Sequence, residues 1–360
     1  MPALNPKALV ENRVAAIRDY HAASGIIRAE LDVSGGIDSA VMAGLLVLAL
    51  GADNVTFAHL GISSNPVQTD RAKRLIHGMG GKLVVFDFTE EYGHLIRKMQ
   101  AELLAAGYDI FEIEARMAKD PTILGSIRST LRAPLGRAFN RLTGGGIRHG
   151  TGNECEDRFL RFYQKGGDGE VDTNPIAMLS KAEVYQLAYE LATGGYFPEA
   201  MLAMLDTIAA IPSADLWGAG DKHNDESEIK GWLGADFTYG RLDTATGKVI
   251  NVGTIERVAR FLDRPARDGD IHLGVTNEYH LFDDDPHRPG IHMDLMVEAA
   301  EKSGLFTGFP RDTITALLKG ARKAEKATRH KENPNCPQLG TRKELIAAGI
   351  LSDNFADYGI

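Results

Sequence analysis

A glycine-rich turn between a strand-like segment and a helix constrains this chain more than any other feature. The turn consists of Ser34, Gly35, Gly36, Ile37, Asp38 and Ser39. It follows residues 29–33, where apolar and acidic residues alternate as in a strand, and precedes the apolar helical run 40–50. Adjacent glycines let the backbone approach a ligand closely, and the N–H groups of a helix start can bind an anion. The turn therefore predicts a site for nucleotide phosphates.

The acidic residue of this turn requires a cation if phosphate binds there, because Asp38 would otherwise repel the phosphate oxygens. A Mg²⁺ ion shared by the carboxylate and the phosphates would remove that repulsion. The ordinary alternative is a Ser/Gly turn in which Asp38 is favoured by the helix dipole. We favour pyrophosphate binding, because the whole string lies between a strand and a helix. The turn lacks the lysine of the Walker-type loop, so a kinase or GTPase does not fit.

Strand-like and helical segments alternate along the first part of the chain. Further strands are expected at 55–60, 83–88 and 147–149, and helices at 7–25, 69–79, 90–119, 127–142 and 181–191. Pro134 is expected to interrupt one of these helices. The alternation predicts an α/β fold with a doubly wound, mostly parallel sheet, helices on both faces, and ligands at the carboxyl ends of the strands. The strands 30–33 and 147–149 are more polar than buried parallel strands usually are.

The pattern changes after residue 217. We expect residues 1–217 to form the core and residues 218–310 to form a large C-terminal insertion or subdomain of unknown role. Within that insertion only a hairpin-like turn at 243–247 is readable. Residues 311–360 are expected to form a lysine-rich helix and a tail that returns to the substrate site.

Composition excludes several classes of protein. The net charge of −9 disfavours a chain whose main task is to bind nucleic acid, because such surfaces concentrate Lys and Arg. Two cysteines are too few for a disulfide scaffold and fit a reducing compartment, so we expect the cytoplasm. The most apolar run, 41–50, is about half of the ~20 residues that a membrane span requires, and the N-terminus lacks the apolar core of a secretory signal.

A second group of motifs follows the basic helix 127–142. Residues 150–156 read GTGNECE, residues 165–176 read KGGDGEVDTNPI, and Lys181 comes shortly after them. Taken singly, these are ordinary turns. Their order and spacing together argue against coincidence. The segment combines the cationic side chains of Lys165 and Lys181 with the acidic side chains of Glu156 and Asp172.

The turn at 34–39 resembles the SGG[IV]DS loop of the ATP pyrophosphatases, also called adenine nucleotide α-hydrolases. The second group is similar to the pattern GTGNxxE and KxGDGxxDxNP of the ammonia-dependent NAD synthetases. This resemblance implies a ligase of NAD biosynthesis that uses ATP as co-substrate and Mg²⁺ to amidate deamido-NAD with ammonia. It implies an acyl-adenylate intermediate and the release of AMP and pyrophosphate. It also implies a homodimer without a fused glutaminase, since the ATP loop begins at residue 34.

The resemblance also assigns roles to individual residues. ATP would contact the turn at 34–39 together with Thr151, Lys181 and Ser213, and Ser213 lies within the segment PSADL. Asp38 and Glu156 would bind the metal. The catalytic residues would be Asp38, Lys181 and Glu156. Deamido-NAD would contact Lys165, Asp172, His330, Lys331 and Arg132, with Arg128 as a further candidate on the same basic helix. The alternative for each is a solvated surface or an ordinary turn, and for Ser213 a helix cap.

One departure from the family pattern concerns the metal. The chain carries one more residue than usual between Glu156 and Lys165, which makes Asp157 an alternative ligand. A solvated acidic helix start is the ordinary alternative for these acidic residues. Two other functions stay open. The chain could be another ATP pyrophosphatase, although the acidic balance and the lack of a Cys-x-x-Cys pair argue against a tRNA-modifying enzyme. It could also be a non-catalytic nucleotide-binding protein, although Asp38, Glu156 and Lys181 argue against that.

Overall fold

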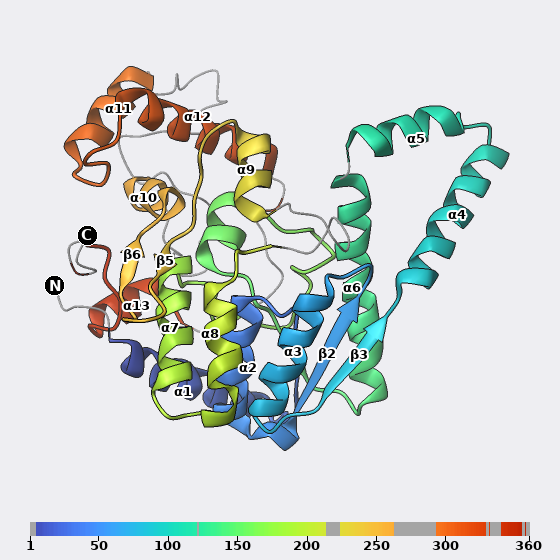
Figure 1. Cartoon of the computed structure of the whole chain (residues 1–360), viewed down its shortest axis with the longest axis horizontal. Coiled ribbons are helices and arrows are strands. Elements are labelled where there is room, and N and C mark those ends of the chain that lie inside the picture. Colours follow the sequence, from blue (N-terminus) through green and yellow to red (C-terminus); the bar gives the residue numbers. More distant parts are fainter. Residues whose placement is uncertain are drawn as a thin grey trace.

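The computed structural model describes residues 5–120, 122–213, 224–262, 293–328, 331, 340–354 and 357. At its centre is a parallel sheet with the strand order β3-β2-β1-β4 (Figure 1). Its strands are β1 (Ala29–Asp32), β2 (Val55–Gly61), β3 (Leu83–Asp87) and β4 (Ile147–His149). The predicted parallel sheet is confirmed, and the strands lie within a residue or two of their expected positions.

Helices cover both faces of this sheet, as predicted. One face packs on α1 (Pro6–Ser24), α2 (Ile37–Leu50), α3 (Pro66–Gly78), α7 (Lys181–Thr193) and α8 (Met201–Ala209), with the short turns η1 (Ala52–Asn54) and η3 (Pro198–Ala200) at their ends. Their apolar side chains form the main core. α2 contributes most clearly, since it is buried along most of its length. The other face packs on α6 (Thr122–Leu142), where Phe139 contacts Ala58 and Leu60 of β2. The loop that precedes α2 therefore opens at the carboxyl end of a central strand.

The segment after β3 differs from the prediction in two ways. The expected helix 90–119 is divided into α4 (Thr89–Ala105) and α5 (Ile110–Lys119), because Gly107 takes a positive φ of 88° between them. Pro134 does not interrupt α6. Pro134 and Thr130 are both exposed, so water can bind the Thr130 carbonyl that the missing proline N–H leaves free. The helices α4 and α5 project from the body as an arm (Figure 1).

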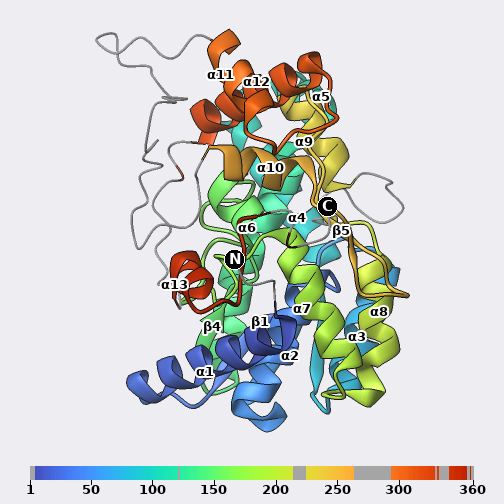
Figure 2. The same ribbon diagram turned by 90° about the vertical axis from the view of Figure 1, so that its left-hand side faces the viewer.

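A second core lies above the carboxyl ends of the strands (Figure 2). It is built by α9 (Asp225–Leu233), α10 (Thr254–Phe261), α11 (Met293–Lys302) and α12 (Arg311–Thr328), with the π-helix η2 (Glu154–Leu160) beneath them. The first three of these helices fall where the sequence showed little periodicity. The turn at 243–247 joins the antiparallel strands β5 (Arg241–Leu242) and β6 (Val249–Asn251), as expected. The domain boundaries at 217 and 310 stay predictions, and the second core takes residues from all three of the proposed parts.

The C-terminal part of the chain returns to the main core beside the parallel sheet. There, α13 (Arg342–Ala347) places Leu345 in the main core, and the Asn5 N–H donates to the Ile350 carbonyl. Among the helices that the structure describes, none combines the length and the apolar character needed to cross a membrane.

The polar residues of the central strands are explained by their pairing with one another. The Arg148 guanidinium on β4 donates to both carboxylate oxygens of Glu30 at 3.1 Å and also contacts Asp32. Burial, assisted by Asp32, raises the pKa of Glu30 to about 8 in spite of Arg148. Gly136 of α6 passes directly over this cluster, where a Cβ would lie 1.7 Å from Arg148 Nη1. The absence of a side chain at Gly136 thus makes room for a buried cation.

We expect Gly136→Ala to lower the free energy of unfolding by about 2–4 kcal/mol, because the new methyl group would displace Arg148 from buried Glu30. Urea denaturation followed by circular dichroism measures this. Gly231→Ala in α9 is the matched control, because nothing lies within 4 Å of the position its Cβ would take. It should instead raise stability by about 0.5–1 kcal/mol. Equal effects of the two substitutions would contradict this interpretation of Gly136.

Candidate active site

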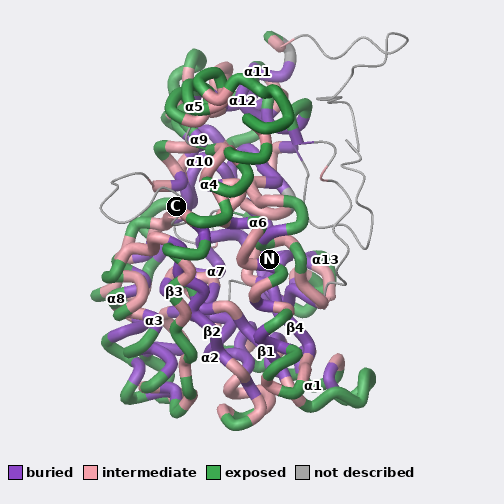
Figure 3. Tube along the Cα trace, turned by 90° about the vertical axis from the view of Figure 1, so that its right-hand side faces the viewer, coloured by how far each residue is buried: buried purple, intermediate pink, exposed green. Residues whose placement is uncertain are grey.

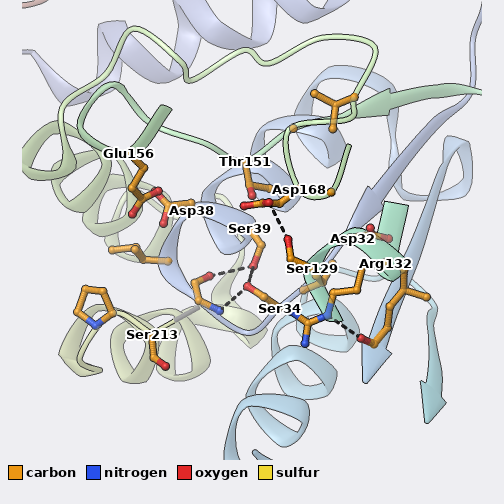
Figure 4. A pocket seen from close by; sticks show the side chains of 18 of the residues that line it. Asp32, Ser34, Asp38, Ser39, Ser129, Arg132, Thr151, Glu156, Asp168 and Ser213 are labelled. Atoms are coloured by element: carbon orange, nitrogen blue, oxygen red, sulfur yellow. Dashed lines mark hydrogen bonds between the residues drawn. The ribbon is translucent and has the colours of Figure 1, made fainter. Parts of the chain in front are cut away.

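The glycine-rich turn is shaped by its backbone and its hydroxyls. Gly35 has a positive φ of 85°, and a Cβ there would lie 2.3 Å from the Gln68 carbonyl oxygen, so only glycine fits. The Ser34 and Ser39 hydroxyls lie 3.1 Å apart, and Ser34 Oγ accepts from the Gly36 N–H (Figure 4). No side chain caps the start of α2, so its first N–H groups are available to an anion.

This turn forms one wall of a cavity of about 230 Å³ at the carboxyl edge of the sheet. Most of the residues that the sequence assigned to ATP or metal line this cavity. They are Ser34, Gly36, Ile37, Asp38, Ser39, Thr151, Glu156, Lys181 and Ser213, and Arg132 lines it as well. Gly35 shapes the turn without lining the cavity. The structure therefore brings residues from five separate parts of the sequence around one space.

A buried ammonium group joins the two carboxylates that were assigned to metal. Lys181 Nζ donates to Asp38 Oδ2 at 2.6 Å and to Glu156 Oε1 at 2.7 Å. Its side chain is only 2% exposed and lies over the Tyr239 ring, 5.0 Å from the ring centroid. Asn153 Nδ2 donates to the other oxygen of Asp38 at 2.9 Å. Figure 4 shows the Asp38 and Glu156 carboxylates converging beside the turn.

The charges of this group do not balance. Burial raises the pKa of Glu156 to about 7, and Asp38 adds to the shift while Lys181 opposes it. Burial alone would lower the pKa of Lys181, but the two carboxylates hold it well above its usual range. Two carboxylates therefore share one cation in a desolvated site. Carboxylate oxygens are ligands that Mg²⁺ accepts readily, and a divalent ion would compensate the remaining charge, so the donor set fits such an ion.

The local structure favours Glu156 over Asp157 as the inward-facing carboxylate. Asn153 caps the π-helix η2 by accepting from the Glu156 N–H at 3.2 Å. The Asp157 carboxylate instead accepts from Asn174 Nδ2 at 3.1 Å and does not line the cavity. A π-helix bonds residue i to residue i+5, so each of its hydrogen-bonded rings contains one more residue than in an α-helix. The form of η2 is therefore compatible with an additional residue after Glu156.

Several residues assigned to the dinucleotide have other neighbours in this structure. Asp172 does not line the cavity; its carboxylate accepts from Arg137 Nη1 at 2.7 Å and from the Arg148 N–H at 2.8 Å. Lys165 is exposed and also lies outside the cavity lining. Lys331 Nζ donates to the carbonyls of Arg161 and Tyr163, just after η2. His330 lies outside the described residues. The dinucleotide roles of these side chains stay predictions.

The two basic residues of α6 lie in different places. Arg132 lines the cavity and donates from Nε to the Leu60 carbonyl at 3.2 Å. Arg128 lies over the Tyr92 ring, 5.4 Å from its centroid, and does not line the cavity.

Sequence reasoning missed other residues of the cavity lining. These are Asp32, His59 and Ser129 among others, and Asp168, which lies within the motif 165–176 but received no role from it. Asp32 lies at the carboxyl end of β1 and His59 near that of β2, so the position of ligands in parallel sheets could have indicated both. Ser129 and Asp168 meet only through tertiary packing, where the serine hydroxyl donates to the carboxylate at 2.8 Å.

Comparisons with known proteins identify the family of this chain. A family model described as NAD synthase matches residues 9–251. The NH(3)-dependent NAD(+) synthetase of Halobacterium salinarum is 33% identical over 222 residues, which cover 61% of this chain and 70% of that protein. The protein of the same name from Methanococcoides burtonii is 29% identical over 259 residues, covering 71% and 85%.

A solved structure adds evidence on the fold alone. It is described as NMN synthetase from Francisella tularensis, has a TM-score of 0.50 and 24% identity, and the match covers 63% of this chain and 82% of that one. The family match spans more than half of the chain and includes both the glycine-rich turn and the residues that converge on it. On these grounds the chain belongs to the NAD synthase family.

Proposed function

We propose that this chain amidates deamido-NAD to NAD with ammonia at the cost of ATP, releasing AMP and pyrophosphate. The observation that carries the proposal is the convergence of Lys181, Asp38 and Glu156 beside an anion-binding turn. The family match and the ammonia-dependent relatives support the same reaction.

In this proposal the turn at 34–39 holds the β- and γ-phosphates. Its hydroxyls and the free N–H groups of α2 supply hydrogen bonds to their oxygens. Asp38 and Glu156 would hold Mg²⁺, which when bound would offset negative charge on the phosphates. No cluster of three or more His, Cys, Asp or Glu suited to a metal occurs among the described residues, so ATP oxygens and water would complete the coordination.

The chemistry then proceeds in two transfers. The nicotinate carboxylate attacks the α-phosphorus, forms a new P–O bond and displaces pyrophosphate, which takes the electrons of the broken bond. Ammonia adds to the carbonyl carbon of this acyl adenylate, AMP leaves with the electrons of the C–O bond, and the surplus proton passes to solvent. Lys181 would counter the charge on the α-phosphate oxygens during the first transfer. Thr151, Arg132 and Ser213 line the space that nucleotide and acid would share.

No covalent protein nucleophile is needed in this scheme. Cys155 lies within the second motif, but it is 1% exposed and burial raises the pKa of its thiol well above its usual value. A buried neutral thiol is a poor nucleophile, so Cys155 serves packing in the second core. The protein would act mainly by alignment and by compensation of charge.

A second copy of this chain is the proposed partner, and the cytoplasm is the proposed compartment. The arm formed by α4 and α5 is largely exposed (Figure 3), and several large apolar side chains on it are exposed to solvent. They are Leu95, Met99, Leu104, Tyr108 and Phe111, the last 79% exposed. Among the residues of these two helices only Tyr92 is buried. Exposed apolar surface of this extent is typical of an interface, and a homodimer would cover it.

The reaction can be tested with purified protein, ATP, Mg²⁺, ammonium and deamido-NAD. We expect NAD and AMP in equal amounts, measured by chromatography, with neither formed when deamido-NAD is omitted. AMP formed only with a different acid acceptor would favour another ATP pyrophosphatase. ATP binding without AMP would favour a non-catalytic nucleotide-binding protein.

The metal assignment can be tested by charge-neutralising substitutions. We expect Asp38→Asn and Glu156→Gln to lower kcat by about 100-fold or more, because each removes a proposed ligand. Asp157→Asn is the matched control and should lower it by less than about 10-fold, because its carboxylate contacts Asn174 outside the cavity. Steady-state kinetics at saturating Mg²⁺, with circular dichroism to confirm folding, measures these effects. A larger decrease of kcat in the Asp157 variant than in the Glu156 variant would show that Asp157, and not Glu156, is the metal ligand.

The dimer interface can be tested at the arm. We expect the wild-type chain to behave as a dimer in light scattering, and the double substitution Leu104→Asp and Phe111→Asp to give a monomer, because charge would be buried in an apolar interface. Leu202→Asp is the control, because Leu202 is 69% exposed but lies on α8, away from the arm. A wild-type monomer, or a double variant that still dimerises, would contradict this assignment.

A further inference from the structure

A row of buried ion pairs runs behind the candidate active site. It alternates in sign and links Glu154, Arg260, Asp353, Arg342 and Glu183, which we call the ion-pair network. Both arginines are almost fully buried, with side chains 5% and 1% exposed. They lie on α10 and α13, beyond the part of the chain that the family model matches. Burial of so many charges requires compensation, which suggests a specific role.

One end of the ion-pair network holds the helix that carries Glu156. Glu154 lies two residues before Glu156 at the start of η2, and both of its carboxylate oxygens accept from Arg260, at 3.1 and 2.5 Å. The Glu154 N–H also donates to the Leu179 carbonyl at 2.8 Å. Arg260 thus ties the first turn of η2 to α10, while the Glu154 backbone ties it to the segment that leads into α7.

The other end holds the helix that begins with Lys181. Glu183 accepts from both terminal nitrogens of Arg342, at 2.7 and 2.8 Å. The same carboxylate accepts from the Ser180 N–H at 2.8 Å and completes the capping box of α7. Asp353 joins the two halves, because its Oδ1 lies 3.0 Å from Arg260 Nε and 2.8 Å from Arg342 Nη2.

The α10 helix contacts the same region a second time. Glu256, one turn before Arg260, accepts from the Ala182 N–H at 3.3 Å and from the Gly240 N–H at 3.1 Å. The backbone on both sides of Lys181 is therefore held by carboxylates: the Ser180 N–H by Glu183, which Arg342 contacts, and the Ala182 N–H by Glu256 of α10. Small displacements there would change the 2.6–2.7 Å contacts that Lys181 makes with Asp38 and Glu156.

We propose that Arg260 and Arg342 are positioning residues, which align Glu156 and Lys181 for the reaction by holding Glu154 and Glu183. This proposal rests on the proposed function only for the identity of the reaction whose rate is measured. The arginines themselves do not line the cavity. Their effect is transmitted through the backbone of η2 and the first turn of α7, where misplacement by about 1 Å can lower a rate by about 100-fold.

The test compares two arginines of one helix. Arg257 lies one turn before Arg260 on α10, is also buried, and donates to the Leu305 carbonyl in the second core. We expect Arg260→Met to lower kcat by about 10–100-fold and to weaken binding of Mg·ATP, measured by calorimetry, with a smaller change in KM for deamido-NAD. Arg257→Met should leave kcat and Mg·ATP affinity within about 3-fold of wild type, although both variants lose stability.

Two further variants separate positioning from simple destabilisation. Arg260→Lys keeps the charge and should bind Mg·ATP more tightly than Arg260→Met but more weakly than wild type. It can replace Arg260→Met in the test if the methionine variant does not fold. If Arg260 acts through Glu154, the double variant Arg260→Met with Glu154→Gln should lose no more activity than Arg260→Met alone. Effects that multiply in the double variant would overturn the proposal.

The Mg·ATP affinity and kcat of the variants decide whether Arg260 positions the active site. Wild-type Mg·ATP affinity and kcat in a folded Arg260→Met or Arg260→Lys variant, or equal losses at Arg257 and Arg260, would overturn the proposal. The calorimetric measurement does not depend on which acid accepts the adenylyl group. Failure of the proposed function would appear as wild-type protein that makes no NAD, whereas failure of positioning would appear as unchanged nucleotide binding in the variants.

Discussion

The buried contact of Lys181 with Asp38 and Glu156 is the interaction on which the rest of this structure depends. Desolvated charges are costly unless they are paired and held in place, and here two carboxylates share one ammonium group. The surrounding elements meet this requirement together. A central strand delivers the turn, the π-helix η2 directs Glu156 inward, and a capped helix begins at Lys181. The excess negative charge that remains is suited to a cation brought with a nucleotide.

Much of the fold could be predicted because it rests on local signals. The alternation of strands and helices, the helix that begins at Lys181 and the hairpin at 243–247 all depend on neighbouring residues, and the structure contains each of them. The two groups of motifs and the segment PSADL assigned Asp38, Thr151, Glu156, Lys181 and Ser213 to ATP or its metal, and these residues line one cavity. A turn that only glycine can form and a helix that begins at a fixed residue leave strong traces in sequence.

The remaining features depend on contacts between distant segments. The polar strands could be explained only when Arg148 was seen to pair with Glu30 beneath Gly136. Pro134 does not break α6, because its side of the helix faces solvent. The pairing of Asp172 with Arg137 has no local signature either. Helices α9, α10 and α11 were missed because they are only 9, 8 and 10 residues long, so each offers little more than two turns of periodicity, and their partners in the second core are distant in the sequence.

The central claim is that the turn at 34–39 and the paired carboxylates together hold the pyrophosphate end of ATP. A crystal structure with Mg²⁺ and a non-hydrolysable ATP analogue tests it most directly. The account predicts the β- and γ-phosphates against the turn, a metal ion between Asp38 and Glu156, and the Lys181 ammonium turned toward the phosphates. An empty turn, or Lys181 still paired with both carboxylates while the nucleotide binds elsewhere, would contradict it.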